Sequence, residues 1–142
     1  VVARKLRAVV TAFEEERLLA VMAAVSRGYS DPWGVDYETL GGHLNRLMAD
    51  SDGLQVELVL GEARVVGEEV GIGLEFAVSG RGDQVREELL GSATEPCVAV
   101  LLWRKETPGW RLASTLELDI PELRDELESR RGAAFLSSPS AP

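Results

Sequence analysis

The side chains that could carry chemistry are few, and the clearest candidates lie close together in the chain. Asp31 precedes Pro32, and Tyr29, Tyr37 and His43 supply phenol and imidazole groups nearby. A carboxylate or an imidazole can act as a general base, and a phenol can donate to an oxygen that gains charge. An Asp before Pro is also common in turns, where its carboxylate accepts backbone amides. The sequence leaves both roles of Asp31 open.

Tryptophan side chains are a second set of candidates. Trp33, Trp103 and Trp110 could stack on a flat ligand. Large aromatic side chains also dominate protein cores and subunit interfaces, so packing is the competing interpretation. His43 lies beside Leu40 and Leu47 on an expected helix, where a histidine at the edge of an apolar face is more common than a catalytic base.

Metal and cofactor chemistry find little support in the sequence. The chain has one cysteine and one histidine, Cys97 and His43, whereas a zinc or transition-metal site needs a cluster of such ligands. Cys97 lies in an apolar run and is expected to be a small buried hydrophobic residue. We therefore predict no metal, no cofactor and no disulfide within the chain.

Charge and hydropathy limit the partners. The 142 residues carry a formal net charge of −9, which disfavours phosphate backbones, so we expect no nucleic-acid partner. The longest apolar stretch, from Val98 to Trp103, is too short to span a bilayer. The sequence starts at Val1 without a methionine, so a cytoplasmic location is only slightly favoured over an exported protein or lipoprotein whose leader was removed.

Helical periodicity fills the first third of the chain. Residues 3–26 carry apolar side chains at helical spacing, and this stripe changes phase around Glu16, which predicts two helices or one kinked helix. A further helix is expected over residues 37–49, with Asp36 as its N-cap. Gly41 and Gly42 lie inside that helix, and a close backbone approach would explain them.

Alternation with a period of two follows. It predicts four to six antiparallel strands. A bulge is expected near Gly61, where the alternation slips by one residue. Pro121 should open a short charged helix that ends near Arg131 and, being polar nearly all round, is loosely docked. The expected strands cover residues 54–66, 70–78, 85–90, 97–105 and 110–118, and the turns between them include residues 79–84 and 106–109.

Helices followed by antiparallel strands define an α+β domain. The sequence predicts one domain over residues 1–131, with a core of about 3–118, a C-terminal helix of about 121–131 and a disordered tail over 132–142, which is rich in Ser, Pro and Ala. Three N-terminal helices would pack on a strongly curved sheet. A cone of this kind can stay partly empty.

The ordered set of features resembles the NTF2-like superfamily, in particular its SnoaL-like and ketosteroid-isomerase-like branches. The resemblance covers residues 3 to about 116. It rests on the helical opening that ends in the segment from Val25 to Gly34, the helix of Tyr37 to Met48, the strand of Leu54 to Val66, and the closing segment from Leu101 to Leu112 with its charged turn and Gly-Trp pair. The resemblance implies a cone-shaped pocket and, as is common among family members, a homodimer that pairs through the open face of the sheet.

The isomerase-like branch uses an Asp before Pro as its general base, and Asp31 resembles it. That branch also needs two donors to the enolate oxygen, and here the first-helix position matches Phe13, which has no hydroxyl. The second position falls near Val100 or Leu101, which are apolar. Two of the three parts are therefore missing.

These observations favour a non-catalytic domain that binds a small apolar ligand or another protein. The alternative is an isomerase-like or cyclase-like enzyme with Asp31 as general base on an apolar carbonyl substrate. A third interpretation is a purely structural interaction module whose pocket is filled by its own side chains. The residues expected to contact a ligand are Phe13, Tyr29, Trp33, Tyr37, His43 and Trp103.

Overall fold

The computed structural model describes residues 1–81, 85–107 and 109–136, and the side chains of residues 132–136 are not part of that description. Residues 79–81 of the turn expected at 79–84 belong to a strand that continues to Arg81. The rest of that turn, residues 82–84, and one residue of the turn expected at 106–109 lie outside the described residues. Glu106 N–H donates to the carbonyl of Gly109 at 2.9 Å, which closes the second turn. No helix in the described part is long and apolar enough to cross a membrane.

Three helices open the chain: α1 (Val2–Glu14), α2 (Leu18–Ala23) and α3 (Tyr37–Asp50). The predicted break falls between α1 and α2, where Glu16 has a left-handed backbone with φ of 59°. Asp36 is the N-cap of α3, and its carboxylate accepts the amide of Thr39 at 2.8 Å. These backbone bonds lower the pKa of Asp36. The predicted N-cap is therefore confirmed.

Five antiparallel strands form one sheet in the order β1-β2-β4-β5, with β3 paired to the far end of β2. The register of β1 against β2 shifts between Leu60 and Ala63, beside the predicted bulge at Gly61. Two further irregularities interrupt the pairing of β4 with β5. Such bulges bend strands, which lets the sheet curve around a hollow. The strands are β1 (Gln55–Val66), β2 (Glu69–Arg81), β3 (Arg86–Leu90), β4 (Cys97–Lys105) and β5 (Trp110–Asp119).

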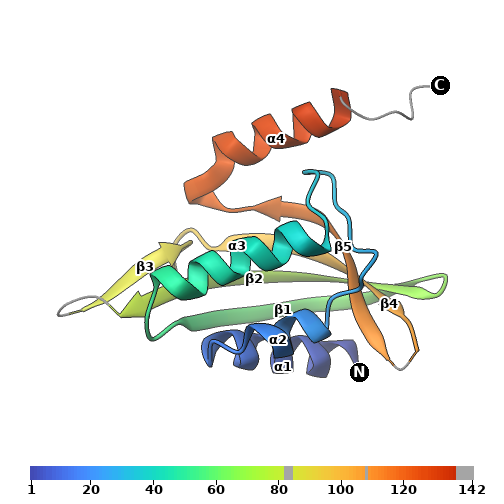
Figure 1. Ribbon diagram of the computed structural model, residues 1–142, viewed down its shortest axis with the longest axis horizontal. Helices are drawn as coiled ribbons and strands as arrows, with labels where there is room; N and C mark the ends of the chain where they lie inside the picture. Colours follow the sequence, from blue (N-terminus) through green and yellow to red (C-terminus); the bar gives the residue numbers. More distant parts are fainter. Residues whose placement is uncertain (82–84, 108, 137–142) are drawn as a thin grey trace.

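The helices lie along the sheet, and the apolar core fills the space between them (Figure 1). Leu6 of α1 packs with Ile72 and Trp103 of the sheet, while Phe13 packs with Met48 and Val78. Glu14 of α1 also accepts the amide of Val56 at the start of β1, at 2.9 Å. The structure thus has the predicted α+β architecture, with helices packed on a curved antiparallel sheet.

The segment between α2 and α3 is fastened to β5. Val25 forms a parallel bridge with Leu112, and Ser26 N–H donates to the carbonyl of Leu112 at 2.9 Å. The Ser26 hydroxyl donates to Glu106 at 2.7 Å. This attachment fixes Tyr29 and the residues that follow it against the sheet.

The C-terminal part is longer than expected. The short helix η1 (Pro121–Leu123) leads into α4 (Arg124–Leu136), so α4 continues past the expected end at Arg131. The alanines that follow Gly132 are strong helix formers, which accounts for the extension into the first part of the expected tail. Residues 137–142 lie outside the described residues. Arg124 anchors the start of α4 through Asp119 at 2.8 Å and Glu95 at 3.2 Å.

Candidate functional site

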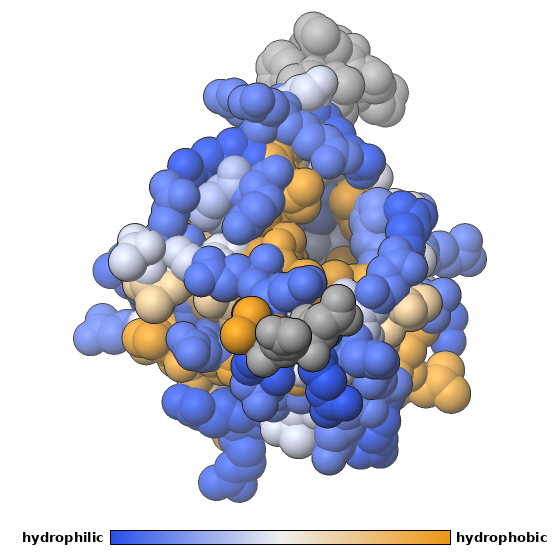
Figure 2. Space-filling model, turned by 90° about the vertical axis from the view of Figure 1, so that its left-hand side faces the viewer, coloured by the Kyte–Doolittle hydropathy of each residue, from blue (hydrophilic) through white to orange (hydrophobic). Residues whose placement is uncertain are grey.

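A cavity of about 600 Å³ lies between the curved sheet, the helices α1 to α3 and the C-terminal helix α4. Pockets that bind small molecules have volumes of roughly 300–1,000 Å³. On the end of the molecule that Figure 2 shows, hydrophobic side chains are visible in a hollow surrounded by hydrophilic residues. The cavity exists because α4 stands away from the sheet and the sheet curves beneath it (Figure 1).

The cavity lining is mostly aliphatic and aromatic. Inward-facing residues of the strands, such as Leu58, Leu74 and Leu101, form its floor, and Leu123 and Leu127 project from η1 and α4. The polar and charged residues of the lining are Tyr29, Asp31, His43, Arg46, Thr115, Glu126 and Arg130, beside the indole of Trp33.

Part of the polar lining is a hydrogen-bonded network centred on Tyr29. The Tyr29 residue is only 3% exposed. Its hydroxyl donates to Asp31 Oδ2 at 2.6 Å and lies 2.8 Å from Thr115 Oγ1. Because the phenol O–H donates its hydrogen bond to Asp31, the Thr115 hydroxyl donates to the phenol oxygen. Burial, and then the hydrogen bond to Asp31, raise the pKa of Tyr29, so the phenol stays protonated.

Asp31 is held by its own segment. Its Oδ1 accepts the amides of Trp33 at 3.0 Å and Val35 at 3.1 Å, while its Oδ2 accepts Tyr29. Both carboxylate oxygens are thus in use, as in the turn interpretation of an Asp before Pro. A general base needs a free oxygen to accept a substrate proton, and these three donors already occupy both oxygens of Asp31. Asp31 does line the cavity and is half-buried, which keeps the general-base interpretation within geometric reach.

The structure brings together most of the residues that were expected to contact a ligand. Phe13, Tyr29, Trp33 and His43 line the cavity with Asp31. Trp103 is 1% exposed and packs in the core beneath α1.

Tyr37 and Trp103 are absent from the described cavity lining, so four of the six residues expected to contact a ligand lie at the cavity. Tyr37 packs beside Met22 and Val25, with the guanidinium of Arg27 4.6 Å from its ring centre. Strand alternation shows that a residue faces inward, but it cannot show whether a helix or the open cavity lies above it. Trp103 faces inward and is covered by α1, so it does not line the cavity.

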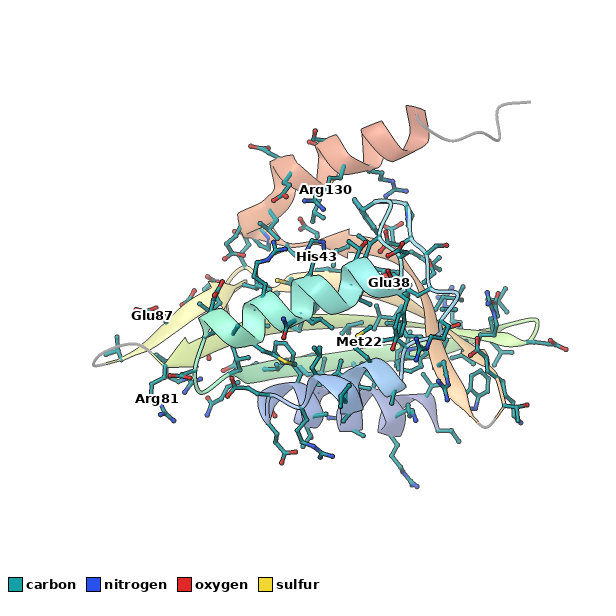
Figure 3. All side chains as sticks on the ribbon, viewed as in Figure 1. Met22, Glu38, His43, Arg81, Glu87 and Arg130 are labelled. Atoms are coloured by element: carbon teal, nitrogen blue, oxygen red, sulfur yellow. The ribbon has the colours of Figure 1, made fainter. Side chains whose placement is uncertain are left out.

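Four polar or charged residues of the lining were missed by sequence reasoning: Arg46, Thr115, Glu126 and Arg130. Arg46 follows His43 by three residues, so both lie on one face of α3. Figure 3 shows Arg130 extending from α4 toward α3, where His43 faces it. The spacing of Leu123 and Leu127 was the available signal that α4 has a face toward the cavity.

The remaining chemistry candidates are structural. Cys97 is fully buried, and burial, assisted by the charges of Glu122 and Asp119, raises its pKa to about 11. A thiol in this state is unreactive at neutral pH. The residues that the structure describes contain no group of three or more His, Cys, Asp or Glu side chains that could hold a metal ion.

Comparison with known proteins supports the fold. No protein-family model and no curated protein sequence matches the chain. Among solved structures, the chain is similar to a candidate dehydratase of the NTF2-like family from Streptomyces avermitilis, with a TM-score of 0.65, 15% identity, and 81% of this chain and 91% of that chain covered.

Two other similar structures are proteins of different kinds. A candidate aromatic ring hydroxylase from Novosphingobium aromaticivorans has a TM-score of 0.64 and 11% identity, with coverage of 87% of this chain and 92% of that one. A candidate calcium/calmodulin-dependent protein kinase type II association domain from Thiobacillus denitrificans has a TM-score of 0.60 and 14% identity, with coverage of 79% and 89%.

The chain therefore has the NTF2-like fold, as the sequence predicted. Its class is that of small α+β proteins in which a curved sheet and helices enclose an apolar cavity. Proteins of this fold include enzyme candidates and association domains, so the fold alone does not assign an activity.

Proposed function

We propose that this protein is a non-catalytic binding domain that holds a small apolar ligand in its cavity. The observation that supports this most directly is the cavity of about 600 Å³ itself, with its predominantly aliphatic and aromatic lining. Burial of apolar surface contributes roughly 25 cal/mol per Å² of ligand, so such a lining favours an apolar molecule. A purely structural module would have filled this space with its own side chains.

The enzyme alternative has weaker support. Asp31 lines the cavity, but three donors hold its carboxylate. Phe13, which the sequence resemblance matches to a hydroxyl donor of the isomerase-like branch, also lines the cavity and has no hydroxyl. Loss of one oxyanion donor typically costs about 3–4 kcal/mol of transition-state stabilisation. The residues present fit ligand binding better than proton abstraction.

A thermal-shift measurement with uncharged apolar probes tests the proposal. We expect that one or more of a steroid ketone, an aliphatic ketone and a polycyclic aromatic raises Tm. A ligand at 100 times its Kd stabilises by about 2.7 kcal/mol, which corresponds to roughly 5–10 °C for a domain of this size. Leu101→Trp should abolish the shift by filling the cavity.

Leu102→Trp is the matched control, because the neighbouring residue on β4 points to the opposite face of the sheet. It should keep the shift. Absence of any shift across the panel, or an equal shift in Leu101→Trp, would contradict the proposal. Turnover of a bound ketone that disappears in Asp31→Asn would favour the enzyme alternative instead.

A further inference from the structure

The charges around the cavity are unevenly distributed. Of its described lining residues, those with a full charge at neutral pH are Asp31, Arg46, Glu126 and Arg130. Asp31 belongs to the segment before α3. Arg46 lies nine residues beyond Tyr37, the first residue of α3, which places it about 14 Å further along the helix. Arg46 thus lies further along α3 than the Asp31 segment, while on α4 the charge of Arg130 is accompanied by that of Glu126.

The two arginines are available to a ligand. Arg46 is exposed, and no carboxylate of the described residues forms an ion pair with it. Arg130 pairs with Glu126 at 2.9 Å within α4, and both side chains are about half exposed. An exposed pair of this spacing contributes only about 0.3–0.5 kcal/mol, so a ligand can compete for Arg130.

His43 and Arg46 of α3 and Arg130 of α4 all line the cavity. Arg46 follows His43 on α3, and Arg130 extends from α4 toward His43 (Figure 3). An imidazole N–H and two guanidinium groups are all donors, and guanidinium groups bind carboxylates in a bidentate geometry. The whole chain has a net charge of −9, so cationic groups at the apolar cavity contrast with the mostly negative potential of the rest of the protein.

We infer that the ligand is an amphiphile with one acidic group, an apolar acid whose carboxylate contacts Arg46 and Arg130. Its hydrocarbon body lies in the apolar cavity. The negative charge of Asp31, with both oxygens already bonded, disfavours the opposite orientation. This inference rests on the proposed function and adds to it the chemical class of the ligand.

Three probes with the same ten-carbon chain and different head groups test the inference: decanoate, decanol and decylammonium, below their micelle concentrations. Isothermal titration calorimetry at pH 7.5 and low salt measures each Kd. We expect decanoate to bind at least tenfold more tightly than decanol, and decylammonium to bind most weakly. The preference should shrink in 0.5 M NaCl, because salt screens exposed charges.

Variants connect the preference to the two arginines. In Arg46→Gln/Arg130→Gln the ratio of decanol Kd to decanoate Kd should fall to about one. Arg46→Lys/Arg130→Lys, which keeps the charges, should restore most of it. Arg4→Gln/Arg7→Gln on the exposed side of α1 removes the same number of charges away from the cavity and should keep the wild-type ratio.

The outcomes separate this inference from the proposed function. Equal binding of decanol and decanoate to the wild-type protein, or a preference for decylammonium, overturns the inference and leaves the apolar cavity as a binding site. An acid preference that persists in Arg46→Gln/Arg130→Gln also overturns it. Failure of all three probes, together with no thermal shift from the uncharged panel, counts against the proposed function itself.

Discussion

Single residues in this cavity are defined by their partners more than by their type. Asp31 has the sequence context of a general base, yet its oxygens bind Tyr29 and the amides of Trp33 and Val35. Tyr29 in turn connects this segment to Thr115 on β5. The network holds the segment before α3 against the sheet and gives the apolar cavity one polar edge. Its main contribution is therefore to the shape of the site.

The Tyr29 network predicts a pH-dependent stability. Because the folded protein raises the pKa of Tyr29, the folded state keeps the phenol proton at pH values where the unfolded chain, with a pKa near 10, has released it. The corresponding stability is complete below about pH 10 and is lost as pH rises further. Tyr29→Phe should therefore show a shallower loss of unfolding free energy between pH 9.5 and 11 in urea titrations.

The same variant has an effect at neutral pH. Tyr29→Phe removes the hydrogen bonds of the phenol to Asp31 Oδ2 and Thr115 and should lower the free energy of unfolding by about 1–3 kcal/mol at pH 7. The pKa of Cys97 is also raised, so Cys97 lowers the stability of the wild type and of Tyr29→Phe equally at alkaline pH. Its contribution therefore cancels when the two free energies of unfolding are subtracted. Parallel stability profiles of the wild type and variant above pH 9.5 would contradict the role of Tyr29.

At the scale of elements, α3 carries two adjacent glycines that the structure distinguishes. A Cβ at Gly41 would lie 3.3 Å from the methyl group of Met22, whereas a Cβ at Gly42 meets nothing within 4 Å. The expected close approach thus involves a side chain at Gly41 and is absent at Gly42. Figure 3 shows Met22 below α3.

The two glycines should respond differently to alanine. Gly42→Ala should raise the free energy of unfolding by about 1 kcal/mol, because alanine loses less backbone entropy in a helix interior. Gly41→Ala should gain clearly less, since Met22 must move to admit the new methyl group. Chemical denaturation of the two variants makes the comparison, and a larger gain at Gly41 would show that the α2–α3 contact is looser than described.

At the scale of the whole molecule, the outer face of the sheet carries exposed apolar residues. The register aligns Val59 with Glu75 and Val98 across three strands. Val59 is 65% exposed and Val98 is 40% exposed. Gly71 and Gly73 lie on the same face of β2, and the space above them is open. An exposed, partly apolar sheet face supports the proposal that two copies of the chain pair through it.

The paired assembly can be tested by sedimentation. We expect the wild-type protein to form a dimer at micromolar concentration and Val59→Asp/Val98→Asp to weaken association at least tenfold, because a symmetric interface would bury each new charge twice. Val65→Asp, an exposed valine near the end of the β1–β2 hairpin, is the control and should leave the dimer intact. A wild-type protein that sediments as a monomer at high concentration would contradict the proposal.

Sequence periodicity determined the elements of this protein. The change of phase near Glu16, the capping carboxylate of Asp36 and the slip beside Gly61 each correspond to a local backbone feature in the structure. Local patterns are informative here because capping, helical spacing and strand alternation depend on neighbours within a few residues. The α+β order, and with it the NTF2-like fold, followed from these elements.

Only the tertiary structure decided which residues share the cavity. Asp31 and Thr115 are far apart in the chain and meet through Tyr29 because Val25 and Ser26 fasten their segment to β5. Arg130 reaches the site because α4 stands away from the sheet and lines the cavity between them (Figure 1). Such placements depend on long-range packing, which residue spacing does not encode. Trp103 shows the same limit, since its inward face is covered by α1.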